Sequence, residues 1–544
     1  MRLQEYKESM KKKFVIHPFL IALFPVISLW VANLNYVTAN MVIRSLILVV
    51  ILSGLLFLLL HLMTHEWEKA GVITSLILLI ILTYGHFYTV LRGVQLLSPI
   101  IRHRYLLPLV GVLVGFMIFL VLKNGKTVSP IASFMTVLGL VLVSISLTRL
   151  IVYQINVTSF DFKASQKISE TSSSVQSDTP DIYYIILDAY GREDTLKEFY
   201  GYDNSEFIQA LKQRGFYVAE KSNSNYMNTY YSLSSSLNMD YLDNYVSQNG
   251  GRMSSQFLSG LINNSKLREF LRSQGYKMVA FESSYENLSS ADVFLKPREQ
   301  KNLSGQSILA INEFEGMLID TTIGKIWLDI FYNQQKTNEK SILMVPYLQH
   351  ANRVTFALTE LGNVAKMPGK KFVFAHVVSP HPPFIFSSNG DLIFPPRPYS
   401  LSDGDYFSGG EKEYISGYTE QIQYINKLVL KAVDEIMANS SEPPIIIVQG
   451  DHGPGAFAVF GSIDKSNVQD RMGMLNAYYF PDQNYTSLYP SISPVNSFRV
   501  ILDNFFGEVL GLLPDNHFFS TGTDFALDYS WTVNFTNVNE YLNR

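Results

Sequence analysis

Five apolar stretches near the N-terminus constrain the fold of this chain more than any other feature. They cover residues 14–34, 42–63, 72–91, 105–122 and 131–148. Each has about the length that a helix needs to cross ~30 Å of hydrocarbon, so the sequence predicts five transmembrane helices. The first is an anchor rather than a cleaved signal peptide, because its apolar region is too long and a second stretch follows after a very short loop.

Lysine and arginine in the short loops predict the orientation of these helices, since positive charge stays on the cytoplasmic side of a membrane. One side carries Arg2, Lys7, Lys11, Lys12, Lys13, Lys69, Lys123 and Lys126, and the other carries Arg44, Arg92, Arg102, Arg104 and Arg149. The basic cluster before the first stretch places the N-terminus in the cytoplasm. With an odd number of spans, everything after about residue 150 then lies outside the cytoplasm.

Composition excludes several kinds of partner and chemistry. The chain has 544 residues, a net charge of −4 and no cysteine. A near-neutral charge without a basic stripe excludes nucleic acid as the partner. The absence of cysteine excludes disulfides, thiolate zinc sites and a cysteine nucleophile.

Three parts of the chain differ in pattern. Residues 1–155 contain the apolar stretches, and residues 156–180 are polar, serine-rich and nearly free of large apolar groups, as in a linker. Across residues 181–544, strand-like runs alternate with helical ones, for example residues 205–214 and 418–437. This alternation predicts an α/β domain in which helices flank a central, mainly parallel sheet.

Three hydrophobic runs in this domain end in acidic, basic or metal-binding side chains. The residues at these ends are Asp188 after 182–187, His376 within and His381 after 372–378, and Asp451 with His452 after 445–448. Runs of this length, rich in Ile, Val and aromatic residues and without helical periodicity, predict buried strands of a parallel sheet. Catalytic groups gather at the carboxyl ends of such strands, so we expect these side chains to converge on one crevice.

The carboxylates of Asp188 and Asp451 and the imidazole of His452 suit a divalent ion. One imidazole among oxygen ligands favours Zn or Mn and also admits Mg or Ca. Thr229, where a loop becomes a helix, is the candidate fourth ligand and nucleophile. A catalytic zinc lowers the pKa of bound water from 15.7 to about 7, on the order of 10 kcal/mol, whereas a helix N-terminus offers ~2 kcal/mol at best. A Thr229 nucleophile therefore requires the metal.

Each of these residues also has a purely structural interpretation. Asp188 could cap a helix after its strand, and the Asp-His pair could simply lie in a turn. Thr229 could be an ordinary N-cap, in which case Ser232 or Ser234 would act instead. His381, which lies between two prolines, could be structural.

Four motifs occur in a fixed order: Asp188 after the first strand, Thr229 opening a helix, Ser-Pro-His-Pro-Pro-Phe at 379–384 and Gly-Asp-His-Gly at 450–453. This ordered set resembles the sulfatase-like branch of the alkaline phosphatase superfamily. Five spans ahead of such a domain resemble the lipoteichoic acid synthases and the lipid A phosphoethanolamine transferases. The resemblance covers the membrane arrangement and residues 188–453 of the soluble domain.

The resemblance implies a role for each matching residue. Those that would bind one divalent ion are Asp188, Thr229, Asp451 and His452. Thr229 would also be the covalent nucleophile, and His381 would face the phosphoryl group or the incoming hydroxyl as an acid, base or oxyanion partner. His376 is a further candidate for the same pocket. Asn228, directly before Thr229, is a candidate for substrate contact, and Arg499 could either reach an anionic substrate or form a surface salt bridge.

The chain departs from the family pattern at three points. The Cys/Ser-x-Pro-x-Arg motif of formylglycine sulfatases is missing around Thr229, and Ala189, rather than a second acid, follows Asp188. Both differences disfavour cleavage of sulfate esters. The further Asp and His ligands of two-metal members are also missing. Related transferases often place another histidine soon after the Asp-His pair, but here none occurs before His517, so contacts to the acceptor must differ in part.

The implied function is metal-dependent transfer of a phosphoryl head group, of the phosphoglycerol or phosphoethanolamine type, from a phospholipid to a hydroxyl of a cell-envelope glycan or lipid. The transfer would pass through a phosphothreonine intermediate. The implied location is the cytoplasmic (inner) membrane of a bacterium, with a multi-pass anchor and an extracytoplasmic catalytic domain. Arg92, Arg102 and Arg104 could hold the donor phosphate or simply lie at the interface. Two alternatives are a membrane-anchored hydrolase of phosphate or sulfate esters on envelope glycans, and a non-catalytic membrane sensor.

Overall fold

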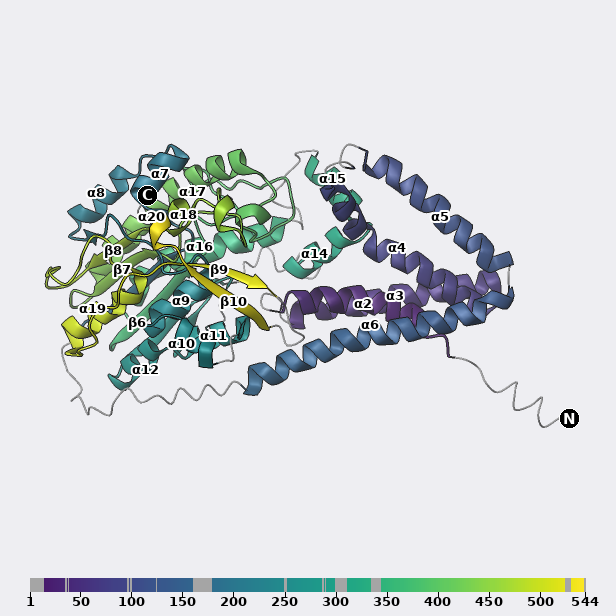
Figure 1. The fold of residues 1–544 in the computed structure, drawn as a ribbon, viewed down its shortest axis with the longest axis horizontal. Coiled ribbons are helices and arrows are strands. Elements are labelled where there is room, and N and C mark those ends of the chain that lie inside the picture. The colour runs from purple at the N-terminus through teal and green to yellow at the C-terminus, as the bar shows by residue number, and fades with distance from the viewer. Residues whose placement is uncertain are drawn as a thin grey trace. The chain divides into compact units, whose positions relative to one another are not determined.

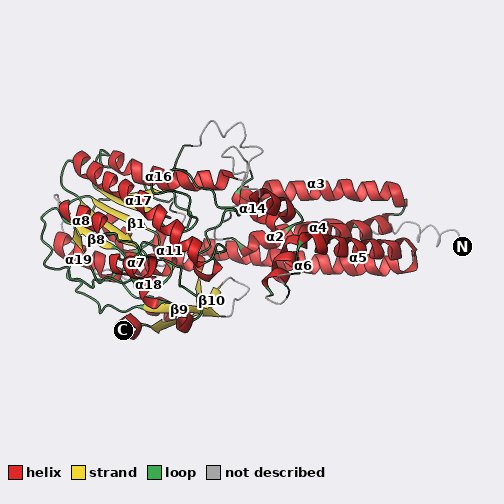
Figure 2. Ribbon diagram, turned by 90° about the horizontal axis from the view of Figure 1, so that it is seen from above, coloured by secondary structure: helices red, strands yellow, loops and turns green. Residues whose placement is uncertain are grey.

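The computed structural model describes residues 14–34, 37, 39–94, 97, 100–123, 125–159, 179–248, 252–285, 288, 290–298, 311–333, 344–523 and 530–542. The chain divides into two compact units (Figure 1). The first consists of residues 1–154, 309–345 and 396–398, and the second of residues 155–308, 346–395 and 399–544. In the described part of the chain, helices make up the first unit, whereas the second combines strands with helices (Figure 2).

The first unit holds the apolar helices that the sequence predicts. They are α2 (His17–Ala32), α3 (Ala39–Thr64), α4 (Trp67–Gly93), α5 (His103–Lys123) and α6 (Gly125–Ser159). Among the described residues, the last four are long and apolar enough to cross a membrane. The helix α2 coincides with the first predicted span, but its 16 residues extend only about 24 Å, less than the hydrocarbon thickness. The described residues thus contain four helices of spanning length and composition, and the fifth span stays a prediction.

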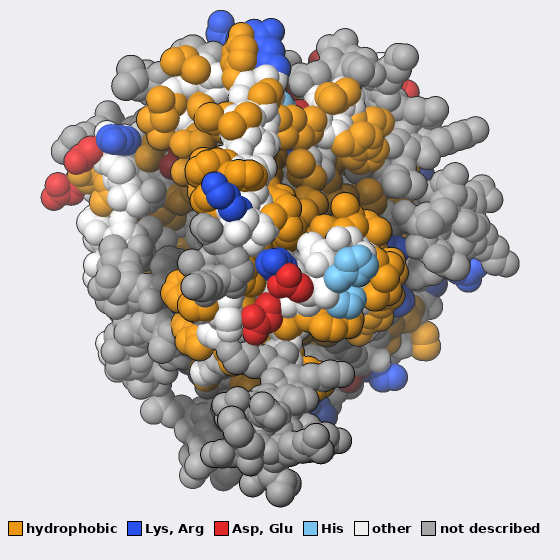
Figure 3. All heavy atoms as spheres, turned by 90° about the vertical axis from the view of Figure 1, so that its right-hand side faces the viewer, with side chains coloured by type: hydrophobic (Ala, Val, Ile, Leu, Met, Phe, Trp, Pro, Cys, Tyr) orange, Lys and Arg blue, Asp and Glu red, His pale blue; other side chains and the backbone are white. Residues whose placement is uncertain are grey.

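The surface of this helical unit is largely apolar. Leu113 on α5 is 56% exposed and Phe134 on α6 is 66% exposed. Hydrophobic side chains predominate on the face drawn in Figure 3, with few charged groups among them. The interior is also apolar, since Ala22 and Val26 of α2 are fully buried against α3 and α4. A large apolar surface of this kind is what lipid covers.

The second unit is built on a seven-stranded sheet of order β2-β8-β7-β1-β6-β4-β5. Its strands are β1 (Ile182–Leu187), β2 (Tyr217–Val218), β4 (Lys277–Phe281), β5 (Val293–Leu295), β6 (Lys371–Val377), β7 (Ile445–Gly450) and β8 (Asn476–Tyr479). The strands from β7 to β5 run parallel, and β8 pairs antiparallel with β7 and β2. The predicted, mainly parallel sheet is therefore confirmed.

Helices cover both faces of this sheet. The second unit contains the helices α7 (Glu193–Tyr200), α8 (Ser205–Gln213), α9 (Thr229–Asn238), α10 (Asp243–Gln248), α11 (Ser255–Asn263), α12 (Lys266–Ser273), α16 (Val345–Val364), α17 (Glu411–Asn439), α18 (Val468–Met472) and α19 (Pro494–Phe506). Helices α16 and α17 lie on one side, and α9, α12 and α19 lie on the other (Figure 1). Because both faces are covered, β1 is buried and apolar along its whole length.

Smaller elements complete the second unit. An antiparallel sheet joins β3 (Arg252–Ser254), β10 (Ser530–Asn537) and β9 (Phe518–Thr523). Two short turns of 3-10 helix, η2 (Gly404–Tyr406) and η3 (Ile463–Lys465), and the helix α20 (Asn539–Leu542) lie in the connecting segments. The small sheet has its own apolar core, which includes Tyr226, Met253 and Phe518.

The elements predicted from the sequence agree with those observed. The run 182–187 is β1, the run 372–378 is β6 shifted by one residue, and the run 445–448 is the start of β7. Helix α17 is longer than predicted, because Glu411 and Glu413 favour a helix N-terminus ahead of the apolar pattern. Of the predicted linker, residues 156–159 continue α6 and residues 160–178 lie outside the described residues.

Two helices of the first unit come from a distant part of the chain. Helices α14 (Glu313–Thr321) and α15 (Lys325–Asn333) lie in sequence between β5 and β6 of the second unit. Asn312 and Glu315 form a capping box that starts α14. The sequence pattern assigned this segment to the α/β domain, whereas its contacts place it with the apolar helices.

Candidate metal centre

Three neighbouring strands carry the predicted functional side chains to one edge of the sheet. Strand β1 lies between β7 and β6, and Leu187 is level with both Gly450 and Val377. Asp188 and Asp451 are therefore the next side chains on adjacent strands, and both are fully buried. His376 lies on β6, level with Ile186. These residues were expected to converge because parallel strands end at one edge of a sheet, and the observed register of β7, β1 and β6 is parallel.

The backbone turns sharply after β1 and ties the two acids together. Ala189 has a left-handed conformation with φ of 60°, which for a residue with a Cβ costs roughly 1–2 kcal/mol. Its backbone N–H donates to Asp451 Oδ1 at 3.0 Å, and the His452 N–H donates to the same oxygen at 3.0 Å. These bonds orient the Asp451 carboxylate and leave Oδ2 for another partner.

Three further predicted residues, His376, His452 and Thr229, lie around these two acids. Asp188, His376 and Asp451 each offer one ligand atom within 4.8 Å of the others. His452 Nε2 lies 3.3 Å from Asp451 Oδ2 and 3.7 Å from Asp188 Oδ1. The Thr229 hydroxyl lies 3.2 Å from the same Nε2. His376, which the sequence assigned to the substrate pocket, thus lies with the metal-type residues, 3.4 Å from Asp188 Oδ2.

The chemistry of this cluster fits a divalent cation. Both carboxylate oxygens of Asp188 and the Oδ2 of Asp451 are buried and accept no hydrogen bond from the described residues. Buried carboxylates without donors are strongly destabilising unless a cation compensates them. We will call Asp188, His376, Asp451, His452 and Thr229 the metal centre.

His452 has the form that a metal ligand needs. Its Nδ1 lies 2.9 Å from the carbonyl of Gly453, and a carbonyl only accepts, so Nδ1 carries the proton and Nε2 keeps its lone pair. Burial, with the nearby Arg471 charge, lowers the pKa of His452 to about 3. The imidazole is therefore neutral at physiological pH.

Thr229 is the first residue of α9, and its contacts differ from those of the alternative nucleophiles Ser232 and Ser234. The N-cap is Asn228, whose exposed side chain accepts from the Tyr230 N–H, so Thr229 is free of that task. Ser232 donates to the Asp451 carbonyl at 2.6 Å and Ser234 donates to the Leu258 carbonyl at 3.2 Å. Both serine hydroxyls are thus engaged with the backbone, and Thr229 alone of the three contacts a metal-type side chain.

His381 lies beside the metal centre with a defined tautomer. Its Nδ1 is 2.6 Å from the Pro382 carbonyl, so Nδ1 is the donor. The Tyr285 hydroxyl lies 3.1 Å from Nε2 and donates to it when the ring is neutral. Asp403 Oδ2 is 3.9 Å from the same nitrogen. His381 can therefore accept a proton at Nε2.

Two buried charged residues of the site gave no signal in the sequence. Arg471 donates to Asp403 Oδ2 at 2.6 Å and to the Met227 carbonyl at 2.9 Å, and its Nη2 lies 3.4 Å from His452 Nε2. Burial by itself raises the pKa of Asp403, but the Arg471 charge and the two neighbouring histidines overcome this and hold that pKa well below its usual range. Neither residue belongs to a motif, because helix α18, which carries Arg471, meets the segment of Asp403 only in the folded chain.

The glycines that follow Asp451 matter because they have no Cβ, and not because of an unusual backbone conformation. A Cβ on Gly453 would lie 2.0 Å from the Asp470 carbonyl oxygen, and a Cβ on Gly455 would lie 2.3 Å from Asp403 Oδ1. Neither glycine has a positive φ. The two glycines thus let helix α18, which carries Arg471, and the segment of Asp403 approach His452.

Of the three predicted substrate-contact residues, His376 lies in the metal centre, and the side chains of the other two bond to the backbone. Asn228 is engaged as the cap of α9. Arg499 on α19 donates to the backbone carbonyls of Met239, Leu510 and Gly511. Since Met239 ends α9, Arg499 satisfies carbonyls at that helix terminus.

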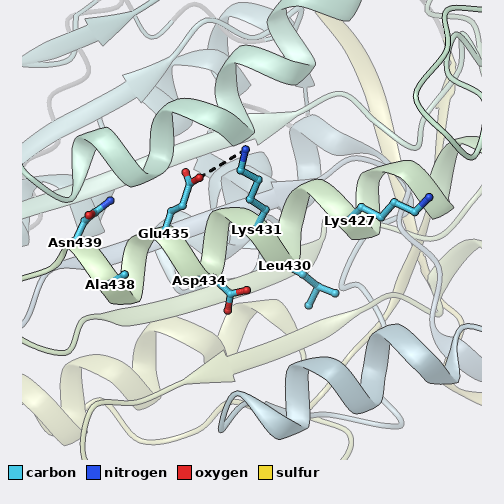
Figure 4. A pocket seen from close by; sticks show the side chains of 7 residues that line it. All are labelled: Lys427, Leu430, Lys431, Asp434, Glu435, Ala438 and Asn439. Atoms are coloured by element: carbon cyan, nitrogen blue, oxygen red, sulfur yellow. Dashed lines mark ion pairs between the residues drawn. The ribbon is translucent and has the colours of Figure 1, made fainter.

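A surface hollow on α17 is unrelated to the metal centre. Figure 4 shows the residues that line it, which are Lys427, Leu430, Lys431, Asp434, Glu435, Ala438 and Asn439. All of them come from α17, and Lys431 pairs with Glu435 at 3.7 Å. No side chain of the metal centre reaches this hollow.

The chain thus combines helices that are long and apolar enough to cross a membrane with an α/β unit, and that unit holds a buried cluster of carboxylates and imidazoles that could bind a metal ion. No protein-family model and no curated protein sequence matches the chain. Similar solved structures include the C-terminal periplasmic domain of EptC from Escherichia coli in complex with Zn, at 10% identity and a TM-score of 0.39, covering 63% of this chain and 91% of that one. Another is the corresponding domain of the phosphoethanolamine transferase EptC from Campylobacter jejuni, at 13% identity and a TM-score of 0.33, covering 60% and 90%.

A third similar structure is BT1596, a 2-O GAG sulfatase, at 10% identity and a TM-score of 0.39, covering 64% of this chain and 78% of that one.

Proposed function

We propose that this chain is a membrane enzyme that transfers a phosphoryl-linked head group from a phospholipid to a hydroxyl of a cell-envelope glycan or lipid. One observation carries the proposal: the buried Thr229 hydroxyl lies 3.2 Å from His452 Nε2, beside carboxylate oxygens that lack hydrogen-bond donors. Such an arrangement destabilises a fold on its own, so it is typical of a catalytic centre. A complete set of these side chains also argues against a non-catalytic sensor.

The cation would be held by Asp188, Asp451, His452 and Thr229, with the nitrogen of His376 close by. When bound, it lowers the pKa of the Thr229 hydroxyl and offsets charge on the phosphoryl oxygens. The oxygen-rich ligand set with one or two imidazoles suits Zn or Mn and admits Mg or Ca.

In the first half-reaction, the Thr229 oxygen forms a bond to the donor phosphorus, and the bond between phosphorus and the diacylglycerol oxygen breaks. The Thr229 hydroxyl loses its proton as its bond forms, and the diacylglycerol oxygen gains one as it leaves. The products are diacylglycerol and a head group esterified to Thr229.

In the second half-reaction, the acceptor hydroxyl bonds to phosphorus and gives its proton to His381 Nε2. The bond between phosphorus and the Thr229 oxygen breaks, and that oxygen regains a proton. The Tyr285 hydroxyl, 3.1 Å from Nε2, occupies the position that the acceptor hydroxyl would take. A hydrolase would differ only in using water at this step.

The apolar helices support a lipid donor. A donor that never leaves the bilayer stays at high effective concentration near an enzyme attached to the same bilayer. On the charge of the loops, we place the catalytic unit outside the cytoplasm, in the inner membrane of a bacterium, and count α2 as the fifth span.

The test uses the purified full-length protein with labelled phosphatidylglycerol and phosphatidylethanolamine, with and without a chelator. We expect diacylglycerol release and a labelled protein, both lost with chelator and in Thr229→Ala, and partly kept in Thr229→Ser. Release of free head group in the presence of acceptor lipids or glycans, without a transfer product, would identify a hydrolase. Full turnover by Thr229→Ala would overturn the mechanism.

A further inference from the structure

Helices α14 and α15 and the short turn between them lie in residues 311–333, which we call the insert. In sequence it interrupts the catalytic unit between β5 and β6, yet all of it belongs to the first unit, with the apolar helices (Figure 1). The chain leaves the first unit at residue 154, continues into the second unit, and comes back to the first unit with the insert.

The start of the insert is anchored in the core of the helical unit. Phe314 is fully buried in one apolar cluster with Val26 of α2, Val42 of α3 and Leu82 of α4. The next residue, Glu315, forms a two-point ion pair with Arg44 of α3. Bidentate pairs of this kind fix geometry as well as charge.

The turn of the insert lies directly against α4. The Ile323 N–H donates to the Ile81 carbonyl at 2.7 Å, and Ile81 lies inside the segment of α4 that is apolar enough to span a membrane. A Cβ on Gly85, one turn further along, would lie 2.1 Å from the Asp320 carbonyl oxygen and 2.7 Å from that of Thr322. Gly85 therefore permits a backbone-to-backbone approach that no other residue would allow.

The three charged residues of the insert that follow Glu315, which are Asp320, Lys325 and Asp329, are paired within the first unit. Lys325 Nζ lies 2.7 Å from Asp320 and 3.6 Å from Asp329. Asp329 also lies 2.8 Å from His103 Nε2 at the start of α5. Paired charges of this kind are far less costly to place near lipid than isolated ones.

One face of α15 is apolar and exposed in the described part of the chain. Trp327 is 48% exposed and Ile330 is 51% exposed, whereas Leu328 on the other face is 1% exposed. Residues three apart share a face of a helix, so Trp327 and Ile330 form one surface. Phe87 of α4 and Tyr105 of α5, 62% and 54% exposed, extend the same kind of surface along the helices on which the insert lies.

We propose that the insert is a membrane-interface element whose Trp327–Ile330 face enters the lipid bilayer at the boundary between head groups and acyl chains. Its contacts with α3, α4 and α5 hold this exposed apolar face on the same unit as the apolar helices. Tryptophan is the residue that prefers this level of a bilayer, and the two charged residues of α15, Lys325 and Asp329, are paired. A second copy of the chain or another protein would bind a surface that lipid does not cover, and this face does not meet that condition.

The test uses the absence of cysteine, since Ile330→Cys then carries the only thiol of the full-length chain. A nitroxide label at this position is measured in lipid nanodiscs by its accessibility to oxygen, which partitions into lipid, and to a water-soluble nickel chelate. Matched controls are Leu113→Cys on α5, 56% exposed, and Lys431→Cys on α17, whose side chain is 64% exposed (Figure 4).

We expect the ratio of oxygen access to nickel access at Ile330 to lie well above that of the Lys431 label and below that of the Leu113 label, which marks the middle of α5. Nickel access equal to that of the Lys431 label would overturn the proposal. A label shielded from both reagents would also overturn it, because protein rather than lipid would then cover this face. The result does not depend on catalysis.

A second variant tests the packing of the insert against α4. Gly85→Ala in the Ile330→Cys background is expected to displace the insert and raise nickel access several-fold. Gly111→Ala on α5, where an added Cβ meets nothing within 4 Å, is the matched control and should leave the label unchanged. Unchanged nickel access of the label in Gly85→Ala would contradict the packing of the insert against α4.

Discussion

Arg471 and Asp403 form a charged pair that is buried at the wall of the metal centre. Such a pair adds little net stability, because desolvation offsets the attraction of its charges. Its position accounts for it better: Arg471 lies 3.4 Å from His452 Nε2, and Asp403 lies 3.9 Å from His381 Nε2. The pair therefore sets the electrostatic surroundings of both histidines.

Breaking this pair should be much more harmful than replacing it. Asp403→Ala leaves the Arg471 charge buried and should lower the free energy of unfolding by roughly 3–5 kcal/mol. The double variant Asp403→Leu/Arg471→Met should recover most of this loss while activity stays low. Thermal unfolding of the three proteins measures the effect, and equal melting of Asp403→Ala and the unaltered protein would contradict it.

The pH dependence of this contribution has a definite sign. The folded state holds the pKa of Asp403 below its ordinary value of 3.8, so the stabilisation is fully present above that value and is lost only as pH falls toward the lower folded pKa. The difference in unfolding free energy between the unaltered protein and Asp403→Asn should thus stay constant between about pH 8 and about pH 5 and shrink in stronger acid.

Helix α9 is the element that positions the nucleophile, and it is held at both ends. Asn228 caps its first turn, and Arg499 donates to the carbonyl of Met239 at its other end. Asn228 and Arg499 are two of the three residues for which the sequence suggested substrate contact. Their bonds explain their presence without a substrate, since each satisfies backbone groups that a helix terminus leaves open.

Arg499→Met should act on stability rather than on substrate binding. It removes three bonds to backbone carbonyls, so we expect a loss of roughly 1–3 kcal/mol in the free energy of unfolding. The KM for the lipid donor should stay within about twofold, because the guanidinium does not reach the metal centre. A raised KM for the lipid donor at unchanged stability would show instead that Arg499 contacts the substrate. Asn504→Ala, on the exposed face of the same helix, is the control.

At the scale of the whole molecule, the two compact units should respond differently to loss of the cation. A ligand at 100 times its Kd stabilises the folded state by about 2.7 kcal/mol, and here it also compensates buried carboxylates. Chelation should therefore lower the unfolding transition of the catalytic unit and leave that of the helical unit in place. Calorimetry with and without chelator measures this.

Asp188→Asn is the control for that experiment. It removes one buried carboxylate, so the metal-free protein should become more stable while the response to chelator largely disappears. An identical chelator shift in this variant would show that the ion binds elsewhere.

Much of the fold follows from patterns that neighbours in the chain create. Apolar stretches and uninterrupted Ile and Val runs depend on local burial, so β1, β6, β7 and the spanning helices could be placed from the sequence. The order of motifs placed Asp188, Thr229, Asp451 and His452 in one site, because parallel strands end at one edge of a sheet.

Other features depend on partners far apart in the chain, which no local pattern encodes. Tertiary packing alone brought His376 to Asp188, paired Arg471 with Asp403, engaged Arg499 at a helix terminus and placed residues 311–333 with the apolar helices. The physical reason is the same in each case. Composition and periodicity decide which segments must be buried, whereas the register of the sheet and the close approach of loops decide which side chains meet there.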